Sequence, residues 1–144
     1  MMDKELQVKL DAYPVKMTEK VVWGDMDAFQ HVNNTVYFRY FESVRMEFMR
    51  QTDMLELFEN SQIGPILAAS SCDFRAPLTY PDTIHIGARV TDIQDRKFYS
   101  EYIVISEKLN KVAAEGSGLM VYFDYATGKA CSVPEAVAAA IRKL

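Results

Sequence analysis

The most regular hydrophobic pattern lies in the first third of the chain. Apolar side chains recur there at intervals of three and four residues, which is the spacing of one face of an α-helix. The positions in this stripe are Val36, Tyr37, Tyr40, Phe41, Val44 and Phe48. Because Phe38, Met46 and Met49 lie outside the stripe, we expect burial on more than one side. The pattern predicts a long helix from Asn33 to about Thr52.

A different pattern, with every second residue apolar, predicts β-strands. It is clearest in TIHIGARVTDI, residues 83–93, whose even-numbered positions are apolar up to Val90. His85 falls on the polar face and is expected to be solvated. Segments rich in β-branched and aromatic residues predict further strands at 15–23, 66–74, 98–107 and 112–125. A linker is expected at 59–65. This order favours an α+β fold, with the helix covering an antiparallel sheet, over a doubly wound nucleotide-binding fold.

A short helix is expected at the end of the chain. Ser132 stands three residues before Glu135, with Pro134 between them, which is the spacing of a capping box. The sequence AVAAAIRKL follows, so the helix should run through it. A turn is expected shortly before, at Thr127 and Gly128.

Length, composition and charge bound the class of protein. With 144 residues, of which 49% are hydrophobic and 25% charged, the chain fits a single domain spanning residues 1–144. No apolar run reaches the roughly 20 residues of a membrane span, and the start MMDKELQVKL lacks a signal-peptide pattern. The net charge is −4 and the basic residues are scattered, which gives no long-range attraction for nucleic acid. We expect a cytoplasmic protein that binds neither nucleic acid nor a membrane.

Cysteine, histidine and glycine patterns argue against several kinds of site. Cys72 and Cys131 are too few for a disulfide framework, so free thiols are expected. Together with His31 and His85 they lack the short paired spacings of a zinc site, and we expect no metal. The sequence EGSGL lies inside a predicted strand, which argues against a dinucleotide loop and against a serine nucleophile elbow. We expect no cofactor, and attribute these glycines to a close backbone approach.

The polar residues in front of the predicted helix are the candidate chemistry. Asp25 and Asp27 lie in the loop GDMDAFQH, and the helix begins near Asn33 or Asn34. A helix start carries unpaired N–H groups and a partial positive charge, which favour a developing oxyanion. A carboxylate beside such donors is what hydrolysis of an acyl carbonyl requires. In the structural alternative, the aspartates bond only to turn backbone, the asparagines only cap the helix, and His31 is a structural hydrogen-bonding residue.

The segment WGDMDAFQHVNNTVYFRYFESVRMEFM resembles the one that leads into the central helix of hotdog-fold acyl-CoA thioesterases, in the 4-hydroxybenzoyl-CoA thioesterase-like family. The shared features are an aromatic strand end, the D-x-D loop, HVNN and a following aromatic residue. A weaker likeness continues through SSCDFRAPLTYPDTIHI, DRKFYSEYIVI and AAEGSGLMVYFDYATGKACSVP, so it covers nearly the whole chain. The resemblance implies a hotdog fold, an antiparallel sheet of about five strands wrapped around a long central helix.

For the chemistry, the resemblance implies an acyl-CoA thioesterase with Asp27 as the catalytic carboxylate. Whether that carboxylate attacks the thioester directly or activates a water molecule stays open. Backbone N–H groups near Asn33 and Asn34 would orient the thioester carbonyl, and His31 would contact the substrate at the helix entrance. Asp25 is expected to be a loop residue.

The resemblance also implies how the substrate and the subunits are arranged. Arg75, Arg96 and Lys97 are candidates for binding the phosphates of coenzyme A, with acyl carrier protein as an alternative carrier. An exposed sheet edge and a helix that is apolar beyond one face predict a homodimer or a homotetramer. Its active site would lie between subunits, with Asp27 facing residues 66–76 of the partner subunit.

Two other functions stay open at this point. A non-catalytic acyl-CoA binding protein could use the same cleft, although it would be expected to carry a further module, for which 144 residues leave no room. A hotdog hydratase or dehydratase would need an acid–base histidine deep in the cleft, and His31 is the only histidine near the right place. The acyl group itself is not predicted.

Overall fold

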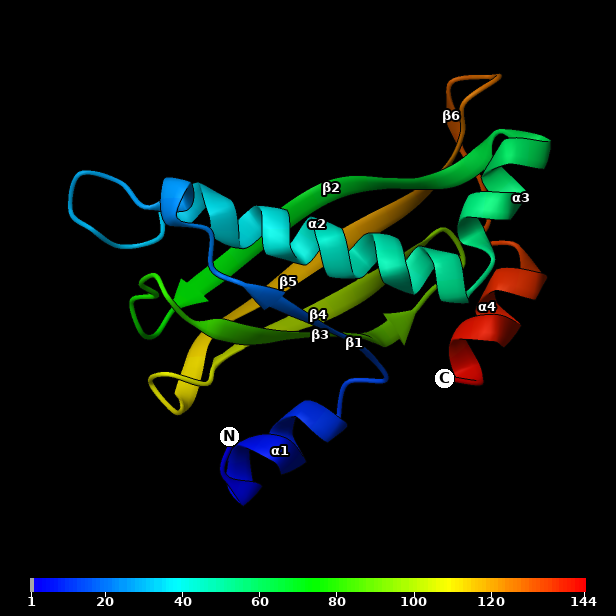
Figure 1. The fold of residues 1–144 in the computed structure, drawn as a ribbon. Helices are drawn as coiled ribbons and strands as arrows, with labels where there is room; N and C mark the ends of the chain where they lie inside the picture. Colours follow the sequence, from blue (N-terminus) through cyan, green and yellow to red (C-terminus); the bar gives the residue numbers. More distant parts are fainter. Residues whose placement is uncertain (1) are drawn as a thin grey trace.

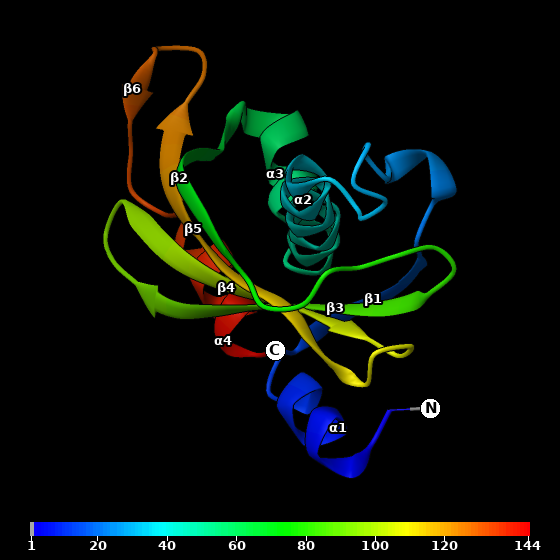
Figure 2. The same cartoon turned by 90° about the vertical axis from the view of Figure 1, so that its left-hand side faces the viewer.

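A curled antiparallel sheet wraps around one long helix (Figures 1 and 2). The computed structural model describes residues 2–144. Its strands are β1 (Val15–Lys20), β2 (Ile63–Phe74), β3 (Thr83–Ile93), β4 (Lys97–Ser106), β5 (Lys111–Asp124) and β6 (Lys129–Ala130). Its helices are α1 (Lys4–Asp11), α2 (Asn34–Gln51), α3 (Met54–Ser61) and α4 (Glu135–Arg142), with the short 3₁₀ helix η1 (Trp23–Asp25). The order across the sheet is β1-β3-β4-β5-β2, and β6 pairs with β5. The expected α+β fold is confirmed.

Helix α2 lies in the concave face of the sheet because its hydrophobic stripe packs there. Phe41 and Val44 are completely buried, and the Phe41 ring stacks on Tyr102 of β4 with 4.9 Å between ring centroids. Gly116 of β5 faces the same ring, and a Cβ atom at this position would overlap it. A residue without a side chain is therefore needed where helix and sheet meet, as expected for a close backbone approach. Of the three apolar residues outside the stripe, Met49 is buried, whereas Phe38 and Met46 are exposed, so burial beyond the main stripe is confirmed only at Met49.

The bounds of α2 agree with the hydrophobic pattern, since Asn33 and Thr52 are its two capping residues. Outside α2 the pattern misses α1, α3 and β6. Helix α3 follows α2 directly at Asp53, which has a φ of 62°, and neither glycine nor proline marks the break. The linker expected at 59–65 is wrong, because α3 runs to Ser61 and β2 starts two residues later. No helix within residues 2–144 is both long and apolar enough to span a membrane.

The capping box expected before the last helix is wrong as well. Pro134 occupies the N-cap position of α4 with φ −57° and ψ 140°, and no side chain caps the helix. Because this extended proline comes first, the helix begins only at Glu135. Ser132 lies two residues before the N-cap position and does not cap the first turn.

The first strand is shorter than expected, and its end shapes the following loop. β1 stops at Lys20, and Trp23 belongs to η1. Asp25 N–H donates to the Val22 carbonyl at 3.0 Å, and Met26 N–H donates to the Trp23 carbonyl at 3.2 Å. This tight turn takes the chain off the sheet and toward the start of α2.

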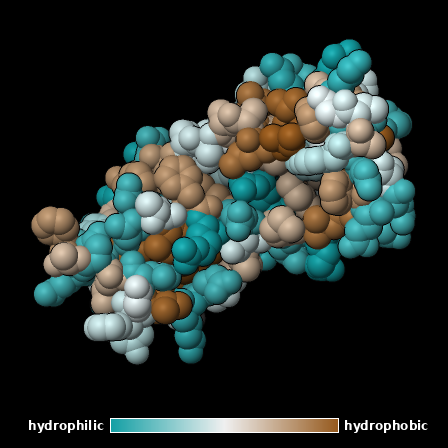
Figure 3. Space-filling model, turned by 90° about the horizontal axis from the view of Figure 1, so that it is seen from above, coloured by the Kyte–Doolittle hydropathy of each residue, from teal (hydrophilic) through white to brown (hydrophobic). Residues whose placement is uncertain are grey.

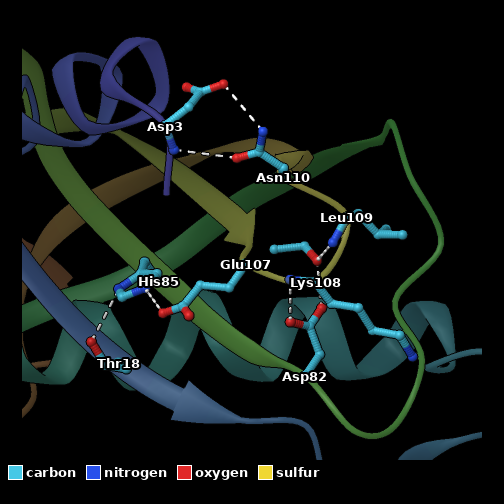
Figure 4. Close-up of polar contacts among 9 residues, drawn as sticks. Asp3, Thr18, Asp82, His85, Glu107, Lys108, Leu109 and Asn110 are labelled. Atoms are coloured by element: carbon cyan, nitrogen blue, oxygen red, sulfur yellow. Dashed lines mark hydrogen bonds and ion pairs between the residues drawn. The ribbon is translucent and has the colours of Figure 1, made fainter. Parts of the chain in front are cut away.

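The connection between β2 and β3 is fixed to two other elements. Asp82 is buried and accepts hydrogen bonds from the Ser106 hydroxyl and from the Lys108 backbone N–H after β4 (Figure 4). Nearer β2, Leu78 N–H donates to the Tyr37 hydroxyl of α2 at 3.3 Å. This irregular segment is therefore held firmly beside the helix start.

His85, expected to be solvated, has polar partners instead. Its Nε2 lies 2.6 Å from the Glu107 carboxylate and its Nδ1 lies 3.2 Å from the Thr18 hydroxyl (Figure 4). The hydrogen bond from His85 lowers the pKa of Glu107. The expectation was wrong because both partners come from segments distant in sequence, on β1 and after β4.

Candidate active site

The residues between η1 and α2 form a closed loop beside the helix start. The two arms of this loop pair at Met26 and Val32. Asp27 N–H donates to the His31 carbonyl at 3.0 Å, and Val32 N–H donates to the Leu78 carbonyl at 2.9 Å. The second bond fastens the loop to the segment between β2 and β3. The loop is thus fixed on both sides by backbone contacts.

The carboxylate of Asp27 is held from two directions. Its Oδ1 accepts the Phe29 backbone N–H at 2.9 Å, and its Oδ2 accepts the Asn33 side-chain nitrogen at 3.2 Å. Asn33 is also the N-cap of α2, since its Oδ1 accepts the Thr35 backbone N–H at 3.0 Å. One side chain therefore ties the orientation of the carboxylate to the first turn of the helix.

The backbone N–H groups at this helix start differ in their hydrogen-bond acceptors. Asn33 N–H donates to the Asp25 carbonyl at 3.0 Å, and Val36 N–H donates to the Asn33 carbonyl at 3.0 Å. Thr35 N–H is taken by the cap. Asn34 N–H has no acceptor among residues 2–144. A helix start leaves such donors unpaired and gives them a partial positive charge, so this amide can bind an oxyanion.

The neighbouring Asp25 has structural contacts instead. Its carboxylate lies 3.7 Å from the Arg39 guanidinium, and its carbonyl accepts Asn33 N–H. These contacts agree with the expected loop role of this aspartate.

Two clefts meet at Asp27, which is the only described residue that lines both. We call the first the Phe74 cleft. It has a volume of about 450 Å³ and is lined by Asp27, Phe29, His31, Val32, Asn34, Tyr37, Phe74, Arg75, Ala76 and Pro77. We call the second the Trp23 cleft. It has a volume of about 560 Å³ and is lined by Trp23, Gly24, Met26, Asp27, Gln30, Thr79 and Tyr80.

The sequence from the end of β1 to α4 matches a known family. A family model described as the thioesterase-like superfamily matches residues 21–141, which include both clefts and α2. The chain belongs to this superfamily. The expected resemblance is confirmed, and this superfamily member is a thioester hydrolase with the hotdog fold.

Individual relatives support this membership over most of their length. The chain is 26% identical to a thioesterase from Thermus thermophilus, solved with coenzyme A and Zn, with a TM-score of 0.80 over 91% of this chain and 93% of that one. It is 22% identical to the long-chain acyl-CoA thioesterase FadM of Escherichia coli, over 79% of this chain and 86% of that protein. The gentisyl-coenzyme A thioesterase BH1999 shares the fold, with 24% identity and a TM-score of 0.77 over 88% and 98% of the two chains.

In this superfamily member, two of the predicted substrate-binding residues line the Phe74 cleft. The exposed His31 lies at its edge. Arg75 also lines the cleft, but its guanidinium lies 2.7 Å from the Glu115 carboxylate and 3.9 Å from the Asp73 carboxylate. Its charge is therefore largely balanced within the chain.

Arg96 and Lys97 lie elsewhere. They are at the turn between β3 and β4, and neither lines either cleft. Arg96 pairs with Asp95 at 3.7 Å, and the Lys97 ammonium lies 5.9 Å from the Tyr99 ring centroid. β3 has 11 residues, so at about 3.3 Å per residue the turn is roughly 30 Å from the end of β3 that adjoins the clefts. One chain therefore does not bring this basic pair to Asp27.

The cysteines take no part in either cleft. Both are free, and burial raises the pKa of Cys72 to about 11. Within residues 2–144 no three His, Cys, Asp or Glu side chains are grouped so that they could hold a metal ion.

The sequence pattern predicts none of the five aromatic residues that line the two clefts as site residues. Tyr37 was assigned only to the helix core, yet it lines the Phe74 cleft and bonds the segment after β2. Trp23 and Tyr80 line the Trp23 cleft, although they are 57 positions apart in the printed sequence. No local signal in the sequence places Tyr80 at the same cleft as Trp23.

Proposed function

We propose that this thioester hydrolase is an acyl-CoA thioesterase whose catalytic carboxylate is Asp27. The proposal is carried by one observation, an oriented carboxylate at the same helix start as an unpaired amide. Asn33 and Phe29 hold the carboxylate, and Asn34 N–H is the unpaired donor. Coenzyme A is favoured as carrier because the Thermus thermophilus relative was solved with it and FadM is named for acyl-CoA.

In the proposed reaction the thioester carbonyl oxygen accepts a hydrogen bond from Asn34 N–H. This donor stabilises the negative charge that develops on the oxygen as the carbonyl carbon becomes tetrahedral. With Asp27 as general base, the carboxylate takes a proton from the attacking water, the carbon–sulfur bond breaks, and the proton passes to the coenzyme A thiolate. With Asp27 as nucleophile, its carboxylate oxygen attacks the carbonyl carbon, the carbon–sulfur bond breaks to release the thiolate, and water then hydrolyses the anhydride that has formed and supplies the proton for the thiolate. Both routes yield the free acid and coenzyme A.

The test is Asp27→Asn, which keeps the size of the side chain and removes its charge. We expect kcat to fall by about 100-fold or more, the scale of a lost acid–base group, with folding and ligand binding retained. Asp25→Asn is the matched control and should do far less. Turnover is followed by thiol release from a panel of acyl-CoA esters. Release of coenzyme A by Asp27→Asn at the wild-type rate would contradict the mechanism.

A single turnover in ¹⁸O water with enzyme in excess shows which carbon the water attacks. ¹⁸O in Asp27 shows that an anhydride formed and that water opened it at the Asp27 carboxyl carbon, which general-base catalysis does not do. Label only in the product acid shows that water attacked the acyl carbon, either in the thioester or in an anhydride. Mass spectrometry of the peptide that contains Asp27 measures the label.

We also propose that the active form is a homodimer or a homotetramer. β2 is the last strand of the sheet, and hydrophobic surface gathers over it (upper half of Figure 3). Leu67 and Phe74 of β2 are 41% and 48% exposed, and Phe38 of α2 is 37% exposed. An unpaired strand edge beside exposed apolar side chains favours pairing with a second copy.

Sedimentation at micromolar concentration tests the oligomer. A stable species of 16.4 kDa that turns over acyl-CoA would contradict it. In the oligomer, Arg96 and Lys97 would reach substrate from the partner subunit. The double variant Arg96→Ala/Lys97→Ala should then raise KM for acyl-CoA more than it lowers kcat, because such contacts are made equally in ground and transition states. An unchanged KM would mean that Arg96 and Lys97 do not bind the substrate.

A further inference from the structure

The two clefts that meet at Asp27 differ in chemistry. The Phe74 cleft has a largely apolar wall, and its one guanidinium, Arg75, is paired with carboxylates. The Trp23 cleft has two exposed aromatic rings, Trp23 and Tyr80, which are 70% and 50% exposed. A substrate whose thioester reaches Asp27 could therefore place different parts in each cleft.

We infer that the acyl-CoA substrate lies across Asp27 with its acyl group in the Phe74 cleft and its coenzyme A end in the Trp23 cleft. The adenine stacks on the ring of Trp23 or Tyr80, and a phosphate faces the ammonium group of Lys108. This inference rests on the proposed function, because it assigns the orientation of the same substrate. It also selects coenzyme A over acyl carrier protein, whose prosthetic arm carries no adenine.

The aromatic rings of the Trp23 cleft suit a purine. Neither Trp23 nor Tyr80 contacts another aromatic ring in residues 2–144, so their faces are available. Their backbones are fixed, Trp23 by the η1 turn and Tyr80 by donation of its N–H to the Met26 sulfur at 3.5 Å. A purine base can stack on such a ring, because every base has a π face. A fixed backbone reduces the entropy lost on binding.

Lys108 supplies the positive charge at this cleft. Its ammonium group donates to the hydroxyl of Thr79, a lining residue, at 2.9 Å. Its backbone N–H is bound to the buried Asp82 at 3.0 Å (Figure 4), so the base of the side chain is fixed. Lys108 forms no ion pair with any residue in 2–144. Its charge is thus available to a phosphate, unlike that of Arg75.

The Phe74 cleft suits an apolar acyl group. Tyr37 and Phe74 pack edge to face with 5.0 Å between ring centroids, and the ring centroids of Phe38 and Phe74 are 6.5 Å apart. Val32, Ala76 and Pro77 add apolar surface. Its volume of about 450 Å³ lies within the usual range for small-molecule pockets. No unpaired cation lines this cleft among the described residues, so a free distal carboxylate on the acyl group would lack a partner.

Binding is tested without turnover through Trp23, the only tryptophan in the chain. Coenzyme A and adenosine 3′,5′-bisphosphate should change Trp23 fluorescence saturably, whereas pantetheine should not. Lys108→Ala should weaken bisphosphate binding by about fivefold or more, and Lys129→Ala, an exposed lysine on β6, should not. A response to pantetheine but not to the bisphosphate would overturn the inference. Because no reaction is needed, this result is independent of whether the proposed thioesterase activity is found.

A kinetic test compares two thioesters of the same acid. The measured quantity is the ratio of kcat/KM for acyl-CoA to kcat/KM for acyl-pantetheine. Trp23→Ala and Tyr80→Ala should together lower this ratio by about tenfold, within the range expected for a lost stacking contact. Tyr125→Ala is the matched control, since Tyr125 is 44% exposed and lines neither cleft.

An unchanged ratio in the Trp23→Ala/Tyr80→Ala variant would overturn the orientation. If the same variant also changed the preference among acyl chains, the acyl group would lie in the Trp23 cleft. This outcome is distinct from failure of the proposed function, in which the wild type shows no turnover of either thioester.

Discussion

Asn33 has two roles that a single substitution separates. Its oxygen caps α2 through Thr35 N–H at 3.0 Å, and its nitrogen donates to Asp27 at 3.2 Å. Asn33→Asp keeps the capping oxygen, because aspartate is as good an N-cap as asparagine, but it replaces the donor with a second carboxylate. Asn33→Ala removes both contacts. We expect the first variant to change catalysis at nearly constant stability.

The size of the effect follows from the distance between the two groups. Two like charges about 4 Å apart repel by about 1 kcal/mol in water and by about 4 kcal/mol at an effective dielectric constant of about 20. Asp27 is only partly buried, so the lower part of this range applies. Repulsion favours the protonated form of the carboxylate pair, and the proposed mechanism needs Asp27 ionised. The acid limb of kcat/KM should therefore move up by about one pH unit, at about 1.4 kcal/mol per unit.

The assay is a pH profile of kcat/KM for both variants and the wild type, together with urea unfolding at neutral pH. Asn33→Ala should lower the free energy of unfolding by about 1 kcal/mol, the usual value of an N-cap, without the upward shift of the acid limb. Asn33→Asp should show the shift without that loss. An acid limb in Asn33→Asp that coincides with the wild type would refute the reasoning, because the added carboxylate at position 33 would then not act on the group that sets this limb.

Three further substitutions or reactions test the packing around this site. Gly116→Ala should lower the free energy of unfolding by about 1 to 3 kcal/mol, because its Cβ overlaps the Phe41 ring; Gly24→Ala, where an added Cβ meets no atom within 4 Å, is the matched control. Asp82→Ala should lower it by about 1 to 3 kcal/mol, since two hydrogen-bond donors lose a buried acceptor. The Cys72 thiol has a pKa of about 11 and should react with a thiol reagent at pH 8 roughly 100-fold more slowly than a thiol with a pKa of 9. The reason is that the thiolate reacts, and a pKa higher by two units leaves about 100-fold less thiolate at this pH. Equal rates would contradict the burial of Cys72.

The long elements of the fold could be predicted because their signals are local and repeated. The apolar stripe of α2 recurs from Val36 to Phe48, over more than three turns, and both of its caps, Asn33 and Thr52, are where the pattern puts them. The short elements could not be predicted in this way. Asp53 breaks α2 from α3 with a positive φ that a glycine would normally indicate. The break between α2 and α3 depends on how α3 packs against its neighbours, and the periodicity of apolar residues carries no information about that packing.

The same distinction holds for the candidate site, where contacts between residues close in sequence could be predicted and contacts between distant residues could not. Asp27 and the asparagines are close in sequence, so the local motif brings them together at the helix start. The predicted phosphate-binding residues are a different case, because Arg96 and Lys97 stand out only as two basic residues next to each other in the sequence. The fold carries that pair to the far end of β3, while Lys108 meets Thr79 across 29 positions. Charge at a site is decided by tertiary contacts, which a single sequence does not display.

The same tertiary contacts link the stability of the sheet to the geometry of the reaction. The Asp27 loop is fastened to the carbonyl of Leu78, and Leu78 N–H is bonded to Tyr37. Further along the segment, Asp82 is bonded to the turn after β4 (Figure 4). We expect that loss of any one of these contacts lets the Asp27 carboxylate move relative to the Asn34 N–H, and displacements of about 1 Å can cost about 100-fold in rate. Asp82, which touches no substrate, should therefore influence kcat as a positioning residue.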